Sequence, residues 1–173
     1  NLPMIKKIAA IGIPNGLENS IFQIGKILVY GIVASFGTAA ITANAVANNI
    51  AGVSVIPGAA IGLSMITVIG RSVGGHEFDQ AKAYTIKLMK ITYGIMLVLN
   101  IAIILLINPI LSIYSLTATT KELALQLAVI HSIMAALIWP SAFTLPNALR
   151  AANDVRFTMG ISVLSMWIFR IVL

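Results

Sequence analysis

The sequence predicts an all-α integral membrane protein. Of its 173 residues, 59% are hydrophobic and only 9% are charged, and the mean hydropathy is +1.00. Soluble domains carry roughly 25% charged residues, so this chain has too few to cover a surface that faces water. Its apolar residues form several blocks, most of them long enough to cross a hydrocarbon core of about 30 Å as helices.

The blocks predict five transmembrane helices, the last one truncated where the sequence stops. We expect them all in one partial repeat that covers 1–173, with spans at about 10–36, 42–73, 85–114, 122–149 and 157–173.

The first span carries three polar side chains, Glu18, Gln23 and Lys26. A charge inside a span costs at least a few kcal/mol, so such residues face other helices or a wet cavity. Glu18 is the candidate for ion coupling, because an intramembrane carboxyl group can exchange a proton or bind Na⁺. Alternatively it is structural, held neutral by hydrogen bonds or close to the headgroups. Lys26 either meets a substrate or Glu18 in the cavity, or reaches the interface along its aliphatic stem.

The second span is rich in small residues, which let membrane helices approach closely. Its Asn44 and Asn48 are four residues apart and share one helical face. With Gln23 and Asn49 they are candidates for lining a substrate cavity, and hydrogen bonds between helices are the equally plausible structural alternative. Pro57 predicts a kink in the middle of this span.

The polar connection after it predicts a helix end at Gly74-Gly75 and a new helix near Asp79, whose carboxylate suits an N-cap. In the fourth span, His131 is a possible proton acceptor or a packing residue. Trp139, followed by Pro140, could lie beside a ligand in the cavity or make an ordinary aromatic contact.

The sequence lacks the residues that other classes of function require. There is no cysteine for disulfides or thiolate metal sites, no histidine pair at metal-ligand spacing, and no nucleophile or phosphate-binding motif. We therefore expect no enzyme, no catalytic residue, no metal site and no cofactor besides a coupling ion. The net charge is +6, but the basic residues sit at block edges and not in a stripe, so no nucleic-acid partner is expected.

These basic residues predict the orientation. If the chain starts in the cytoplasm, five alternating spans leave Lys121 outside, whereas most of the basic residues in the connections lie inside. The inside group is Lys6, Lys7, Arg71, Lys82, Lys87, Lys90, Arg150 and Arg156. We expect a multi-pass protein of the plasma (inner) membrane, with the start and the 71–90 and 150–156 loops cytoplasmic.

The order of motifs resembles one repeat of the multidrug and toxic compound extrusion (MATE) family. The similar segments are Gly12-Ile-Pro-Asn-Gly-Leu-Glu18, Ala34-Ser-Phe-Gly-Thr-Ala-Ala-Ile-Thr-Ala-Asn-Ala-Val-Ala47, Gly74-Gly-His-Glu-Phe-Asp-Gln-Ala81 and Leu149-Arg-Ala-Ala-Asn-Asp154. The closing Met166-Trp-Ile-Phe-Arg170 is similar to the family's eleventh helix and favours the C-terminal repeat.

The resemblance implies five helices of a six-helix lobe in a twelve-helix exporter, with the N-terminal lobe as a partner outside this chain. The family exchanges Na⁺ or H⁺ for organic, often cationic, compounds by alternating access, as repeat-built transporters generally do. Some members carry an acid further along the seventh helix and another in the tenth. Here Glu18 stands near the helix start and 123–149 contains no acid, which leaves the coupling ion open.

The sequence thus predicts an ion-coupled antiporter that is embedded in the lipid bilayer and exports small organic compounds, cationic and amphipathic, by alternating access. One alternative is a flippase of the same superfamily for lipid-linked oligosaccharides, which would favour cationic residues such as Lys26 in the cavity. Another is a membrane scaffold or sensor without transport, whose polar side chains would be paired between helices.

Overall fold

A computed structural model describes residues 2–152, 157–158, 160–161 and 164. Every regular element within these residues is helical, which confirms the all-α prediction. In chain order they are α1 (Leu2–Ala34), α2 (Thr38–Gly74), α3 (Phe78–Ile113), α4 (Ala118–Leu137), the π-helical segment η1 (Pro140–Thr144) and α5 (Leu145–Ala151). The predicted fifth span, 157–173, lies mostly outside the described residues.

Among the described residues, three helices, α2, α3 and α4, are long and apolar enough to cross a membrane. In α1 the apolar stretch Asn19–Ala34 is shorter. The helices carry many large apolar side chains on their outer faces, Leu105 and Ile113 among them. Outward-facing side chains of this kind suit a hydrocarbon environment, because in water they would form an unusually large apolar surface.

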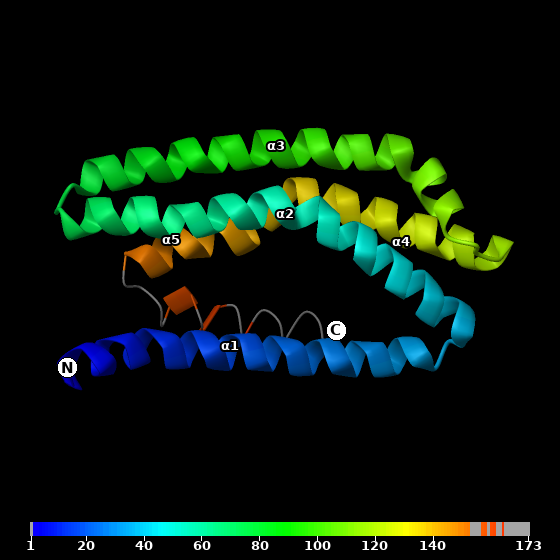
Figure 1. Ribbon diagram of the computed structural model, residues 1–173, viewed down its shortest axis with the longest axis horizontal. Coiled ribbons are helices and arrows are strands. Elements are labelled where there is room, and N and C mark those ends of the chain that lie inside the picture. The colour runs from blue at the N-terminus through cyan, green and yellow to red at the C-terminus, as the bar shows by residue number, and fades with distance from the viewer. Residues whose placement is uncertain (1, 153–156, 159, 162–163, 165–173) are drawn as a thin grey trace.

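The arrangement is centred on α2, which packs against every other element. Figure 1 shows α3 and α4 along α2, and α1 as a separate rod on the other side. The start of α1, the α2–α3 turn and the end of α5 lie at one end of the molecule. The α1–α2 and α3–α4 turns lie at the opposite end, as expected for consecutive spans.

Glycines and one hydroxyl define the turns. Gly37, between α1 and α2, has φ = 93°, a left-handed value that favours glycine. At the end of α2, the Gly75 N–H donates to the Arg71 carbonyl at 3.0 Å. The next helix begins at Phe78 after the N-cap residue Glu77, so Asp79 lies in the first turn and not at the cap. Before α4, the Thr117 hydroxyl oxygen accepts the Thr120 N–H at 3.4 Å.

Two prolines interrupt regular helix geometry. Figure 1 shows α2 bending near the middle of its length, the region that contains Pro57. Pro57 has no N–H to donate to the preceding turn, which is the usual cause of such a bend. In the predicted fourth span, the Leu145 N–H donates to the Pro140 carbonyl. This five-residue spacing makes a π-helical turn, so α4 and α5 are joined by η1 and do not form one regular helix.

Candidate functional site

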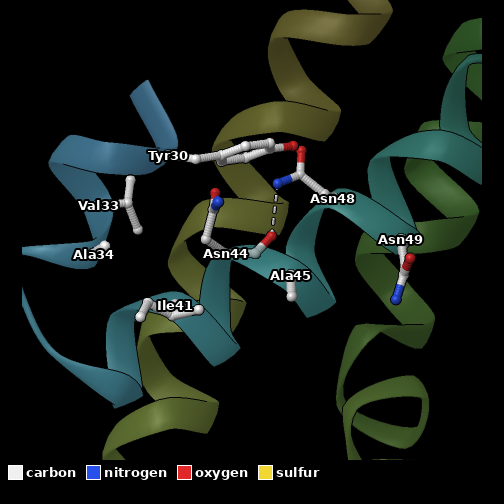
Figure 2. Close-up of a pocket in the computed structure, with 8 residues that line it drawn as sticks. All are labelled: Tyr30, Val33, Ala34, Ile41, Asn44, Ala45, Asn48 and Asn49. Carbon is white, nitrogen blue, oxygen red and sulfur yellow. Dashed lines mark hydrogen bonds between the residues drawn. The ribbon is translucent and has the colours of Figure 1, made fainter. Parts of the chain in front are cut away.

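A pocket of about 360 Å³ lies between the end of α1 and the start of α2. The α1 residues that line it are Tyr30, Val33 and Ala34. The α2 residues are Ile41, Asn44, Ala45, Asn48 and Asn49. Figure 2 shows the Tyr30 side chain reaching from α1 across the pocket toward Asn48.

The pocket follows from the local sequence. The short turn at Gly37 reverses the chain, so the start of α2 lies against the end of α1, and the two helices diverge further from the turn (Figure 1). Asn44 and Asn48 are one turn apart, so both face α1. The Asn48 side-chain amide donates to the Asn44 backbone carbonyl at 2.8 Å. This bond within one helix leaves the Asn48 side-chain oxygen available to the pocket.

The lining combines two kinds of surface. Four of the described lining residues, Val33, Ala34, Ile41 and Ala45, are apolar, and the others carry an amide or a phenol. None of the described residues that line the pocket is charged. Few polar groups on a largely apolar wall are typical of sites for small organic molecules. The pocket can therefore offer hydrogen bonds and an aromatic face to an amphipathic ligand.

The structure places the other candidates elsewhere. Gln23 and Lys26 lie on α1, are exposed, and do not contribute to the pocket. Glu18 belongs to α1, one turn before Phe22, and its side chain lies outside the described part of the structure. Three of the predicted cavity residues, the asparagines, thus come together, and Tyr30 is a member that the sequence reasoning missed.

His131 is half-buried on α4, away from the pocket. Its Nε2 atom has no hydrogen-bond partner within the described part of the chain. The described residues also hold no group of histidine and acidic side chains that could bind a metal ion.

Trp139 belongs to an aromatic cluster that joins α1 to η1. Its ring stacks on Phe143, with ring centroids 5.2 Å apart and planes at 25°. Phe143 in turn meets Phe22 of α1 edge-on at 6.0 Å. The sequence had indicated Trp139 as a candidate, but it gave no signal that Phe22 and Phe143 would pack with it.

The same tryptophan packs against α2 just after its proline. A Cβ atom on Gly58 would overlap the Trp139 ring and lie 3.1 Å from Met96 Sδ. The Thr144 hydroxyl donates to the Gly58 carbonyl oxygen at 3.2 Å. Both contacts join η1 and its flanking tryptophan to the part of α2 that contains Pro57.

Comparison with known proteins identifies the family. The model of the MatE family matches residues 14–173. "Uncharacterized transporter YisQ" of Bacillus subtilis is 25% identical over 94% of this chain and 36% of its own length. "Probable multidrug resistance protein YoeA" of Bacillus subtilis is 26% identical over 91% of this chain and 34% of its own length. "Probable multidrug resistance protein NorM" of Bacillus cereus is 26% identical over 91% of this chain and 35% of its own length.

The chain therefore spans about a third of the length of these relatives. No solved structure matches it. The family match covers most of the chain, and the long apolar helices agree with it, so the protein is a multi-pass membrane protein. The chain belongs to the MatE family.

Proposed function

We propose that this chain forms one lobe of a multidrug exporter that carries small organic molecules across the membrane. The observation that carries the proposal is the α1–α2 pocket, in which amides and a phenol stand among apolar side chains. Relatives whose names describe them as probable multidrug resistance proteins support it. In such an exporter, the N-terminal lobe would supply the facing wall of the transport path.

The pocket's chemistry suits amphipathic compounds. Asn44, Asn48 and Asn49 provide donors and acceptors for polar groups. Tyr30 offers an aromatic face, which attracts organic cations as well as flat aromatic rings. The apolar wall holds the rest of the ligand. This combination favours substrates that are partly apolar and carry a delocalised or shielded positive charge.

Glu18 is our candidate for coupling transport to an ion gradient. It is the acidic residue in the first span, and a carboxylate can bind either H⁺ or Na⁺. Its position one turn before Phe22 places it on the helix that the aromatic cluster links to η1. Occupation of Glu18 would thereby bias how α1 sits against the rest of the lobe, as alternating access requires.

The orientation that we propose places the start of α1 in the cytoplasm. Lys6, Arg71, Lys82 and Arg150 belong to segments at one end of the molecule, and Lys121 lies in the first turn of α4 at the other end. The positive-inside tendency assigns the end with more basic residues to the cytoplasm. The pocket then lies toward the outer side, where an exporter releases its substrate.

No observation specifically supports either of the two alternative functions, the flippase or the scaffold. A flippase for anionic lipid-linked sugars would need cationic residues in the pocket, and Lys26 is not among the residues that line it. A scaffold would pair its polar side chains between helices, whereas the Asn48 amide bonds within its own helix and leaves its oxygen toward the pocket.

Transport by the full-length protein in lipid vesicles tests the proposal. We expect uptake of ethidium, a planar organic cation, into vesicles that hold inverted transporters when either a Na⁺ or an H⁺ gradient is imposed. The gradient that drives uptake identifies the coupling ion. Equal ethidium movement in vesicles with and without the protein, under both gradients, would contradict the proposed function.

A further inference from the structure

The interior of the α2–α3–α4 bundle is interrupted by a polar layer, which consists of Ser54, Asn100 and Ser132. Their side chains are among the most buried in the molecule, with exposed fractions of 0%, 1% and 1%. They come from three different helices, one each from α2, α3 and α4. Polar groups buried this completely in a membrane bundle are expected to be hydrogen-bonded.

The register of the three helices places these residues near one level of the bundle. Ile50, Ile103 and Ala128 belong to a single apolar cluster. The α3 helix runs antiparallel to α2 and α4. The polar layer therefore lies one turn after Ile50 in α2 and Ala128 in α4, and one turn before Ile103 in α3. On the far side of the layer, Gly58 packs close to Met96, again one turn from Ser54 and Asn100. The polar layer therefore crosses the bundle between these two packed levels.

The hydrogen bonds that these side chains make leave some of their donors and acceptors unused. The Asn100 amide nitrogen donates to the Met96 carbonyl at 2.8 Å, and the Ser54 hydroxyl donates to the Ala51 carbonyl at 2.8 Å. The Asn100 side-chain oxygen and the Ser132 hydroxyl have no partner within the described part of the chain. The layer thus presents two acceptors, Asn100 Oδ1 and Ser54 Oγ, and one hydroxyl free to donate, Ser132.

Ser132 differs from comparable residues of the same bundle. The hydroxyls of Ser72 and Thr92, both buried, donate to the carbonyl four residues earlier in their own helices. Serine and threonine side chains inside a helix commonly make this bond when no other partner is near. The Ser132 side chain does not adopt it, and its hydroxyl has no partner within the described part of the chain.

We propose that the polar layer binds one buried water molecule that links α2, α3 and α4. The water donates hydrogen bonds to Asn100 Oδ1 and Ser54 Oγ, and it accepts a hydrogen bond from the Ser132 hydroxyl. These three bonds satisfy every atom left over in the layer, and about three is the usual number for a buried water. The site joins the helices at a level where apolar packing is interrupted, and it does not depend on the proposed transport function.

Thermal unfolding of the full-length protein in detergent tests the site. We expect Asn100→Leu and Ser132→Ala each to lower Tm by about 2 °C or more, because each removes a bond to the shared water. The matched controls are Asn108→Leu, at an exposed position of α3, and Ser64→Ala, at an exposed position of α2. Both should leave Tm within experimental error.

The double variant distinguishes a shared water from separate effects. If one water bridges both residues, Ser132→Ala should lower Tm by much less in the Asn100→Leu background than in the unaltered protein. Fully additive shifts would overturn the proposal. So would an unchanged or higher Tm for Asn100→Leu, since replacing an unbonded buried amide by leucine removes only a desolvation cost.

A high-resolution structure of the unaltered protein provides a check that does not depend on variants that fold poorly. We expect one density peak within hydrogen-bonding distance of Asn100 Oδ1 and Ser132 Oγ, present in Na⁺ and in choline buffers alike. No peak there would overturn the proposal. A peak that appears only in Na⁺ would also overturn it, because the occupant would then be a cation.

Discussion

Gly58 of α2 lies directly against the indole ring of Trp139, with no space between them for a methyl group. The contact occurs one residue after Pro57, where α2 bends. Thr144 adds a hydrogen bond from its hydroxyl to the Gly58 carbonyl. The bend of α2 and the π-helical segment therefore pack closely against each other.

This fit makes Gly58 a glycine whose substitution should be costly. We expect Gly58→Ala to destabilise the protein by about 1–3 kcal/mol, because the new methyl group overlaps the Trp139 ring in a packed interior. Gly52→Ala in the same helix has open space at that position. It should be neutral or stabilising, since alanine favours a helix by roughly 1 kcal/mol over glycine. Chemical denaturation of both variants in detergent measures the difference, and equal stabilities would contradict the tight fit.

The edge-on contact between Phe22 and Phe143 connects α1 to η1. Aromatic pairs contribute about 0.5–1.5 kcal/mol beyond their buried area. We expect Phe22→Ala to loosen α1 and to raise amide hydrogen exchange over Asn19–Ala34 by several-fold. Phe36→Ala, at an exposed position in the α1–α2 turn, is the control. Unchanged exchange in α1 of the Phe22 variant would show that this contact does not hold the helix.

The proposed coupling role of Glu18 predicts a specific defect. Glu18→Gln keeps the size of the side chain but removes the negative charge and the proton exchange, so we expect ion-driven efflux to fall at least tenfold. Glu122→Gln, at an exposed position near the start of α4, should support ion-driven efflux at the normal rate. Dye efflux from cells that express equal amounts of each full-length variant measures this. Gradient-driven efflux at the normal rate in Glu18→Gln would exclude Glu18 from coupling.

Much of the architecture could be predicted because membrane helices leave a local signal. Apolar blocks of sufficient length indicated the long helices, and Gly74-Gly75 marked the turn where α2 ends. Pro57 indicated the bend in α2, since the missing N–H acts on its own helix. The three asparagines of the pocket were indicated by polar side chains in a span with many small residues.

The rest depends on distant parts of the chain. Pro140 stands where regular helix geometry is interrupted, but a proline alone does not specify a π-helical turn over a regular kink. The fit between Trp139 and Gly58 joins positions far apart in sequence, and neither residue type requires it. Tyr30 escaped notice because a tyrosine near the end of a span is commonly an interface anchor. Only the fold shows that it faces Asn48.

The central claim is that the α1–α2 pocket binds the transported compound, and Asn48 tests it most directly. Asn48→Leu keeps the branched shape of the side chain but replaces the amide that faces Tyr30 with an apolar group. Asn108→Leu, the same change at an exposed position of α3 outside the pocket, is the control. Binding of ethidium to the purified full-length protein should weaken about tenfold in Asn48→Leu and stay unchanged in Asn108→Leu. Equal affinities of the unaltered protein and Asn48→Leu would contradict the account.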